Sequence, residues 1–392
     1  MARAGDDRAR VAVYAATRAS RYAAPSHLAG QLRAVLFAPD SKVTSRKEAA
    51  RLAAVRLPTA RAAALLSEVF AVPGAHVDVR AAVVARTGGL LDEEPVWGVL
   101  RAAAGAEPVL RAAVLRVTAL DLPEPHRERY ARLVREATTT DDPETATLAF
   151  AALARWAPWS PEAPMVLATA TTDLSDRTSW RAAAEGLITV AVGSPSGVEG
   201  FEHALRTLAE REATSADADA DADADAGERR DRPARQRLAH VVAGLARRAA
   251  TDPEAVRPAA LAAVALLAGH DALVPHAAGI AVAHLDLEAD PRLLERLAAL
   301  TTGRPALAVR TADALEARLR SPEGEPDELL DAARRLAAHG GHAEGLLAVA
   351  VTGGVGTRTG WAAPWREQLR ALRRHPVPDV RDAALTRLTA QE

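Results

Sequence analysis

The chain has 392 residues, a formal net charge of −2 and no cysteine. This length exceeds what a single compact core usually holds, so several domains or an extended array are expected. The absence of cysteine excludes disulfides, thiolate metal sites and cysteine nucleophiles. Hydrophobic residues make up 49% of the chain but aromatic residues only 3%. Because Ala, Leu and Arg supply most of the bulk and favour helices, the composition predicts an all-α protein packed through small side chains.

Neither the N-terminal residues nor the longest apolar run suggests a membrane protein. Residues 1–10 carry two acids and are followed by no apolar core, so they do not form a signal peptide. The longest apolar run, residues 259–268, is far shorter than the ~20 residues that a membrane span needs. A soluble, cytoplasmic protein without membrane association is therefore expected.

The first part of the chain is basic. Residues 1–60 contain eleven Lys or Arg against four Asp or Glu, a local net charge of +7. Residues 1–45 are expected to form a basic N-terminal helical segment. The sequence Ser45-Arg46-Lys47-Glu48 fits a capping box, which predicts a helix from Arg46 to Arg56.

A short motif, close to Val-Arg-x-Ala-Ala, then recurs along the chain. The interval from Arg80 to Arg111 is 31 residues, and the next interval, to Ala146, is 35 residues. Such a period indicates a helical unit that buries its apolar face only by stacking on copies of itself. Copies of the motif begin at Val79, Leu110, Thr145, Trp180, Val256, Val309 and Val380.

Helix starts are indicated by a repeated combination of a capping residue, a proline and an acid. The cap accepts a backbone hydrogen bond, the proline occupies the first helical position, and the acid complements the helix dipole. This combination predicts helix starts at Asp142-Pro143-Glu144, Ser160-Pro161-Glu162, Asp252-Pro253-Glu254, Ser321-Pro322-Glu323 and, less completely, Asp290-Pro291.

The repeat is interrupted by an acidic, low-complexity stretch. Residues 210–232 alternate Asp with Ala over much of their length, a pattern that buries nothing and repels itself. We therefore predict a solvated linker there, between a repeat arm at 46–209 and a second repeat arm at 233–392.

The chain resembles the HEAT-repeat family in its short bacterial form. The resemblance rests on Val79-Arg80, Leu110-Arg111, Val309-Arg310 and, above all, Asp379–Leu385. It implies an all-α, right-handed solenoid, or superhelix, of roughly nine to ten helix pairs. It also implies that the recurring arginines bond turn acids and carbonyls between stacked repeats. A solenoid offers a long surface and no closed pocket, so a non-enzymatic scaffold that binds a protein partner is the first functional hypothesis.

Candidate partner-binding residues lie on the predicted concave face, which the second helix of each pair should line. No catalytic, cofactor-binding or metal-binding residue is assigned. The candidates are Arg86, Arg116, Arg155, Trp156, Trp159 and Arg387.

The alternative hypothesis is a nucleic-acid-binding protein or a HEAT-like DNA glycosylase. The basic N-terminal arm would contact phosphates, and Trp156 and Trp159 would cradle a nucleotide beside Asp173 or Asp176. Against this hypothesis, a tryptophan next to proline at a helix end commonly fills the wedge between stacked repeats.

Three further observations give weaker support for a functional site. Asp217, Asp219, Asp221 and Glu228 match the spacing of a calcium loop, but Ala222 replaces the glycine that its turn requires. No His is followed by Glu, which disfavours the iron hydroxylases of HEAT type. The glycine-rich stretch Thr352–Gly360 lacks the phosphate-binding Lys-Ser/Thr pair and is predicted to be a long turn between helices.

Overall fold

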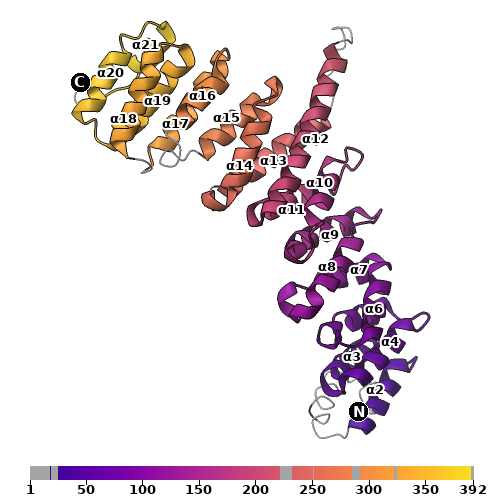
Figure 1. Ribbon diagram of the computed structural model, residues 1–392. Coiled ribbons are helices and arrows are strands. Elements are labelled where there is room, and N and C mark those ends of the chain that lie inside the picture. Colours follow the sequence, from indigo (N-terminus) through magenta and orange to yellow (C-terminus); the bar gives the residue numbers. More distant parts are fainter. Residues whose placement is uncertain are drawn as a thin grey trace. The chain divides into compact units, whose positions relative to one another are not determined.

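The computed structural model of the chain is helical throughout its described length (Figure 1). It describes residue 18 and residues 25–220, 232–249, 251–284, 292–321 and 325–389. Within these ranges the chain forms 20 α-helices, α2 to α21, and no strand. Each helix packs mainly on helices close to it in sequence, which is the arrangement of a helical repeat protein. The all-α prediction of nine to ten helix pairs is therefore confirmed.

The chain divides into two compact units, residues 1–187 (unit 1) and residues 188–392 (unit 2). In unit 1, α3, α5, α7 and α9 contact one another in turn and form an odd layer. The even layer, α2, α4, α6 and α8, packs behind it in the same order. The bounds are α2 Pro25–Phe37, α3 Val43–Arg56, α4 Thr59–Ala71, α5 Val77–Val84, α6 Glu94–Ala104, α7 Pro108–Leu115, α8 Arg127–Glu136, α9 Pro143–Trp156, α10 Ala163–Thr172 and, across the unit boundary, α11 Trp180–Gly193.

Unit 2 repeats this two-layer plan. Its odd layer runs α13, α15, α17, α19 and α21, with each helix in contact with the next, and α18 and α20 pack behind its last members. Leucine and alanine side chains fill the core between the layers. The bounds are α12 Pro195–Ala220, α13 Pro233–Ala249, α14 Pro253–Leu267, α15 Val274–Ala283, α16 Leu293–Thr301, α17 Pro305–Leu319, α18 Pro326–His339, α19 His342–Arg358, α20 Ala363–Leu372 and α21 Pro378–Leu385.

Two of the predicted helix starts are confirmed by their cap geometry. The carboxylate of Asp142 accepts a hydrogen bond from the backbone N–H of Thr145 at 2.9 Å, and α9 begins at the following proline. Asp252 accepts from the N–H of Ala255 at 3.1 Å and starts α14 in the same way. Each carboxylate satisfies an N–H that has no partner within the helix.

Two other predicted starts are wrong. Helix α10 begins at Ala163, three residues after Ser160, whose buried hydroxyl makes no hydrogen bond. Helix α3 begins at Val43, so Ser45 lies inside its first turn and caps nothing. Helix α10 thus begins later than predicted and α3 earlier, and in neither case does the serine occupy the N-cap position. The starts proposed at Asp290 and Pro322 lie outside the described residues.

The glycine-rich stretch Thr352–Gly360 is not a turn. Most of it belongs to α19, whose residues from Gly345 to Gly356 are all buried. A Cβ atom added to Gly354 would lie 2.9 Å from the Cβ of Leu319 in α17. The glycines therefore allow α17 and α19 to approach closely, and packing outweighs the poor helix propensity of glycine.

The region of the predicted linker is helical at its start, because α12 continues to Ala220. Beyond it, α12 and α13 pack against each other. The buried carboxylate of Glu212 in α12 pairs with Arg232 at 3.1 Å and with Arg235 of α13 at 3.2 Å. The chain thus leaves α12 and returns to α13 within unit 2. The rest of the predicted linker, residues 221–231 of 210–232, lies outside the described residues, so this part stays a prediction.

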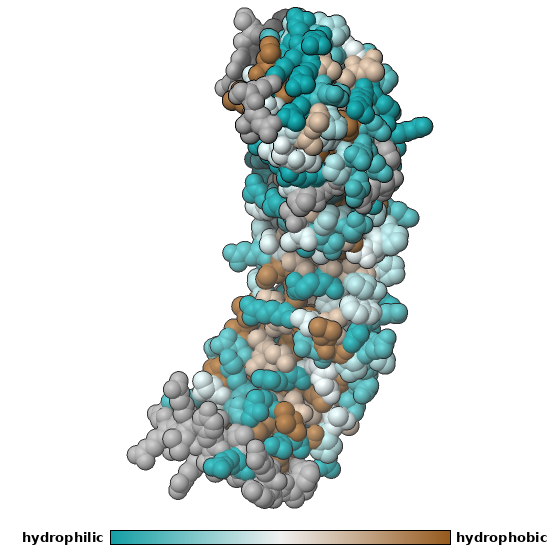
Figure 2. Space-filling view, turned by 90° about the vertical axis from the view of Figure 1, so that its left-hand side faces the viewer, coloured by the Kyte–Doolittle hydropathy of each residue, from teal (hydrophilic) through white to brown (hydrophobic). Residues whose placement is uncertain are grey.

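The surface is mixed in character. On the face shown in Figure 2, apolar side chains form small patches between hydrophilic ones. Among the described helices, none combines the length and the apolar character that crossing a bilayer requires.

Candidate functional site

A large open groove lies on the odd layer of unit 1. Its volume is about 1620 Å³, and it is lined by residues of α3, α5 and α7 and of the turns that follow α5 and α7. The floor is formed by small side chains, among them Ala81, Ala82 and Ala113. Because three stacked repeats each contribute one helix, the groove is a product of the repeat and not of a single motif.

Three exposed cations of this groove have no partner among the residues that the structure describes. They are Lys47 in α3, Arg86 just after α5 and Arg116 at the C-terminal end of α7. Over the described ranges, their side chains make no hydrogen bond, ion pair or ring contact. Two of the predicted partner-binding residues, Arg86 and Arg116, are thereby brought together at one site.

Arginines in the last turns of three other odd-layer helices, α9, α17 and α19, are bonded to the backbone of a neighbouring repeat. Arg155, in the last turn of α9, donates to the carbonyl of Leu115 at 3.4 Å. Arg318, in the last turn of α17, donates to the carbonyl of Val282 at 3.0 Å, and Arg358 of α19 donates to that of Ser321 at 2.9 Å. Arg155 and Arg318 therefore satisfy a carbonyl in the last turn of the preceding odd-layer helix, where the helix itself provides no donor, and Arg358 satisfies one just beyond the end of α17.

The end of α5 explains why Arg116 departs from this pattern. The hydroxyl of the buried residue Thr87 donates to the carbonyl of Val84 at 2.7 Å. A 3-10 turn, η2 (Thr87–Leu90), continues from the helix and folds over its end. The carbonyl that an arginine would reach is thus already satisfied, and the guanidinium of Arg116 stays exposed above the groove.

The acids that line the groove are held locally. Glu48 pairs with Arg51 one turn later in α3, at 2.9 Å and 2.5 Å. Asp121 accepts from the hydroxyl and the N–H of Thr118, at 2.7 Å and 3.2 Å, and these hydrogen bonds lower the pKa of its carboxyl. Asp78 lies in the first turn of α5, where the helix dipole favours a negative charge. The free charges of the groove are therefore predominantly positive.

Two valines on the groove are unusually exposed. The exposed fractions are 58% for Val55 in α3 and 50% for Val109 in α7. Sequence reasoning missed both, together with Lys47, because no motif marks them. One signal was available: the chain contains only two lysines, Lys42 and Lys47, and both line this groove.

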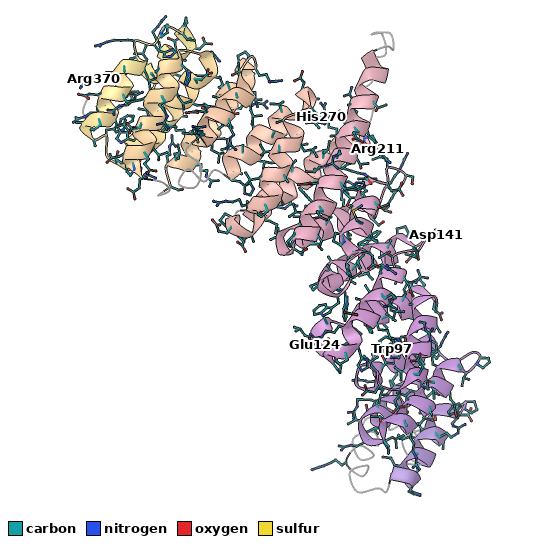
Figure 3. The ribbon with its side chains drawn as sticks, in the orientation of Figure 1. Trp97, Glu124, Asp141, Arg211, His270 and Arg370 are labelled. Atoms are coloured by element: carbon teal, nitrogen blue, oxygen red, sulfur yellow. The ribbon has the colours of Figure 1, made fainter. Side chains whose placement is uncertain are left out.

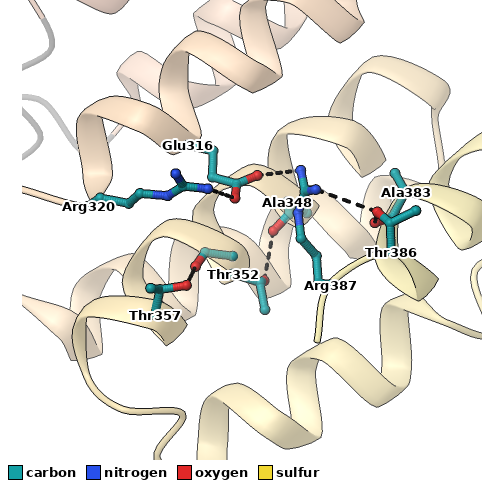
Figure 4. A network of polar contacts seen from close by, with 9 residues as sticks. Glu316, Arg320, Ala348, Thr352, Thr357, Ala383, Thr386 and Arg387 are labelled. Atoms are coloured by element: carbon teal, nitrogen blue, oxygen red, sulfur yellow. Dashed lines mark hydrogen bonds and ion pairs between the residues drawn. The ribbon is translucent and has the colours of Figure 1, made fainter. Parts of the chain in front are cut away.

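Arg387, another predicted partner-binding residue, lies in unit 2 and binds a buried carboxylate. It pairs with the buried carboxylate of Glu316 in α17, which also binds Arg320 at 2.8 Å (Figure 4). Gly353 makes room for this carboxylate, since a Cβ atom there would lie 3.1 Å from its carbon. The pair ties the segment after α21 to α17, two repeats earlier in the odd layer.

The tryptophans of unit 1 form part of an aromatic stack between repeats. Trp156 is fully buried, lies 5.1 Å from the ring of Tyr130 and 5.8 Å from that of Trp159, and donates to the carbonyl of Val117. Trp97, whose place in unit 1 is marked in Figure 3, lies edge-on to Tyr130 with ring centroids 6.4 Å apart. In this arrangement Trp156 offers no surface to a partner and fills the wedge between α8 and α9.

The carboxylates proposed for glycosylase chemistry hold turns. Asp173 accepts from the N–H and the hydroxyl of Ser175, at 3.0 Å and 2.6 Å. Asp176 accepts from Thr178 and Ser179. Partial burial alone would raise the pKa of Asp176, but these hydrogen bonds hold it below its usual value. Both side chains therefore have a structural role between α10 and α11.

Two of the six recurring motif arginines stabilise the turn before their own helix. Arg111 donates to the carbonyls of Ala104 and Ala106, and Arg381 to those of His375 and Pro376. Arg80 instead pairs with Glu107 of the next repeat at 3.2 Å, and Arg257 pairs with Glu254 of its own helix at 3.6 Å. These contacts agree with the structural role that the family resemblance implies.

No metal centre is assembled by the side chains that the structure places. In the described ranges, no three His, Cys, Asp or Glu residues lie close enough together to hold an ion. His342 instead pairs with Asp379 at 3.0 Å. Most of the calcium-like aspartate run lies outside the described residues.

Comparison with known proteins gives little beyond the helical architecture. No protein-family profile and no curated protein matches the chain. Among solved structures, an engineered protein from a structural genomics consortium is 14% identical over 91% of this chain and 97% of its own, with a TM-score of 0.35. A mutant of Kap121p is 11% identical over 98% of this chain, with a TM-score of 0.35, and the chain spans 47% of its length. The class that the helix packing itself defines is an α-helical repeat protein.

Proposed function

We propose that this chain is a HEAT-repeat scaffold without enzymatic activity, which acts in the cytoplasm and binds a protein partner through the groove of unit 1. Stacked helix pairs supply a long surface that needs no closed pocket, which suits a partner that is itself a macromolecule. The candidates Arg86 and Arg116 lie on this groove, while Arg155 lies beyond it on α9.

One observation carries the proposal. Arginines at the ends of α9, α17 and α19 are bonded to backbone carbonyls, whereas Arg86 and Arg116 stand exposed at an open groove and make no bond to any described residue. Fixing a long side chain costs conformational entropy, and the fold recovers this cost where the arginine is bonded. Arg86 and Arg116 make no such stabilising bond to the described part of the fold, which supports a role for them in binding.

The proposal is tested by affinity capture from native lysate with the full chain, with and without nuclease, read by mass spectrometry. Wild type is compared with R86E/R116E and with R61E/R132E, which reverses two exposed arginines on the even layer of the same unit. A protein captured stoichiometrically by wild type and by R61E/R132E, but not by R86E/R116E, supports the proposal. Capture that is equal for all three variants contradicts it.

The nuclease arm addresses the alternative function. Lys42, Lys47 and Arg51 place part of the N-terminal positive charge at the groove, which favours a polyanion as the second candidate. Capture that disappears on nuclease treatment would establish nucleic-acid binding in place of protein binding.

A further inference from the structure

The volume and the openness of the groove in unit 1 point to a polymer segment and not to a small molecule. Pockets for small ligands enclose roughly 300–1,000 Å³, whereas this groove measures about 1620 Å³ and lies across three helices. A peptide that crosses the helices would meet residues from each of them. The groove therefore has the size and form of a peptide-binding surface.

Its charge selects an acidic ligand. Lys47, Arg86 and Arg116 have no partner in the described part of the chain, and arginine stays charged at every physiological pH. The acids of the groove are already engaged by Arg51 and Thr118 or lie at a helix N-terminus, as described above. A carboxylate on the ligand would thus find free guanidinium groups, with which it forms short, charge-assisted hydrogen bonds.

The exposed valines add an apolar requirement. About half of each side chain, Val55 and Val109, is exposed. Both line the groove together with the small residues Ala81 and Ala113. Covering them with aliphatic side chains removes apolar surface from water, which stabilises a complex by about 25 cal/mol per Å² of buried area. A ligand that is acidic but wholly polar would leave this contribution unused.

The same groove is poorly suited to a nucleic acid. None of its lining residues is aromatic, so bases would have no side chain to stack on. Its three carboxylates, Glu48, Asp78 and Asp121, would repel a continuous phosphate backbone, whereas a peptide can place its acids selectively. The observations therefore favour a peptide.

We propose that the groove of unit 1 binds an acidic segment of a partner protein that also carries aliphatic residues. Its carboxylates pair with Arg86 and Arg116, and its aliphatic side chains cover Val55 and Val109. This inference rests on the proposed function. Packed helices lie ~8–10 Å apart, so arginines on the neighbouring helices α5 and α7 match carboxylates about three residues apart in an extended segment.

The test uses a phage-displayed library of random 12-residue peptides selected on the full chain. The most enriched peptide is then measured by fluorescence anisotropy, beside single-stranded and duplex 20-nucleotide DNA at low salt. We expect enrichment of Asp or Glu together with Leu, Ile or Val. The affinity of the peptide should fall at least about tenfold in R86E/R116E and in V109D, and stay within about twofold in R61E/R132E.

Basic or uncharged consensus peptides, equal binding to R86E/R116E and R61E/R132E, or tighter binding of either DNA would overturn the inference. Its failure is distinguishable from failure of the proposed function. If lysate capture depends on Arg86 and Arg116 but the library yields no acidic peptide, only the ligand chemistry is wrong. If capture does not depend on these arginines, the proposed function fails as well.

Discussion

In unit 2, Arg318 and Arg358 each reach from the last turn of an odd-layer helix to a backbone carbonyl at the end of the preceding one. In unit 1, Arg155 is bonded in the same way, whereas Arg86 and Arg116 stand at comparable helix ends but remain exposed beside an open groove. The two units are built on one plan, so the contrast separates arginines that the fold requires from arginines that it does not. Residues that depart from the bonding pattern of a repeat are the better candidates for function.

The odd-layer helices also pack more closely around α19 in unit 2 than around the groove in unit 1. In unit 2, the buried glycines of α19 bring it close to α17 and α21, so little space remains between helices. In unit 1, α3, α5 and α7 leave a groove of about 1620 Å³ with an exposed rim. Unit 2 is therefore expected to respond to substitutions mainly through stability, and the groove of unit 1 mainly through binding.

The largest expected effect is at Gly354. A valine there would place its Cβ 2.9 Å from the Cβ of Leu319 and 3.0 Å from the carbonyl oxygen of Glu316, both in α17. We expect Gly354→Val to destabilise unit 2 by about 3 kcal/mol or more, measured by urea denaturation. The matched control is Gly98→Ala in α6, where a Cβ meets nothing within 4 Å. That control should gain up to about 1 kcal/mol, and equal losses at both positions would contradict the contrast.

The next effect is a dependence on pH in unit 2. Burial, with the nearby charges of Arg318 and Arg257, lowers the pKa of His284 to about 4. In the unfolded chain its pKa is ~6.5, so as pH falls from there the unfolded state binds a proton that the folded state does not. Stability should therefore fall between pH 6.5 and about 4, by an amount on the order of 2–3 kcal/mol, and then level off.

The check is a series of urea denaturation curves from pH 7.5 to 4.5, for wild type and His284→Gln. The variant should show a smaller loss of stability over this range, with a residual slope from His276 and His375, whose pKa values burial also lowers. Acids such as Asp142, whose pKa is lowered by its hydrogen bonds from Thr145, lose their contribution only at lower pH. An unchanged slope in the variant would exclude His284 as the source.

A smaller effect is expected at Arg387. Its replacement by Ala leaves the buried carboxylate of Glu316 with the more exposed Arg320 as its remaining ion-pair partner. We expect a loss of about 2 kcal/mol in unit 2, because removing one partner of a buried pair leaves charge poorly compensated. The control is Arg374→Ala, on an exposed side chain nearby in sequence. Equal stability of the two variants would show that the Glu316 pair contributes nothing.

The smallest effect on stability is expected from R86A/R116A. Both side chains are exposed and make no bond in the described structure, so their removal should change the free energy of unfolding of unit 1 by no more than about 0.5 kcal/mol. Thermal denaturation followed by circular dichroism checks this. A loss above 1 kcal/mol would assign these arginines a structural role after all.

Sequence reasoning succeeded where a local rule decides the outcome. Asp142 and Asp252 start helices because cap, proline and acid all lie within one turn. It failed at Thr352–Gly360, where glycine indicates a turn locally but serves the contact between α17 and α19. That contact joins residues far apart in the chain, so no local pattern reveals it.

The same distinction applies to the candidate site. Arg86 and Arg116 could be named from the position of the second helix in each repeat, but so could Arg155 and Arg387, which are bonded. Which arginines remain free depends on details such as the Thr87 hydroxyl at the end of α5. These details are set by three-dimensional contacts and not by residue spacing.

The central claim is that helix-end arginines bonded to a backbone carbonyl, such as Arg318 and Arg358 in unit 2, are structural, whereas the exposed Arg86 and Arg116 in unit 1 are not. Hydrogen-exchange mass spectrometry of the full chain tests it directly, with wild type compared with R86A/R116A and R318A/R358A. We predict faster exchange at the C-terminal turns of α15 and α17 in R318A/R358A, because their carbonyls lose a donor. Peptides from α5 and α7 should exchange in R86A/R116A as they do in wild type. Equal loss of protection in both variants would contradict the claim.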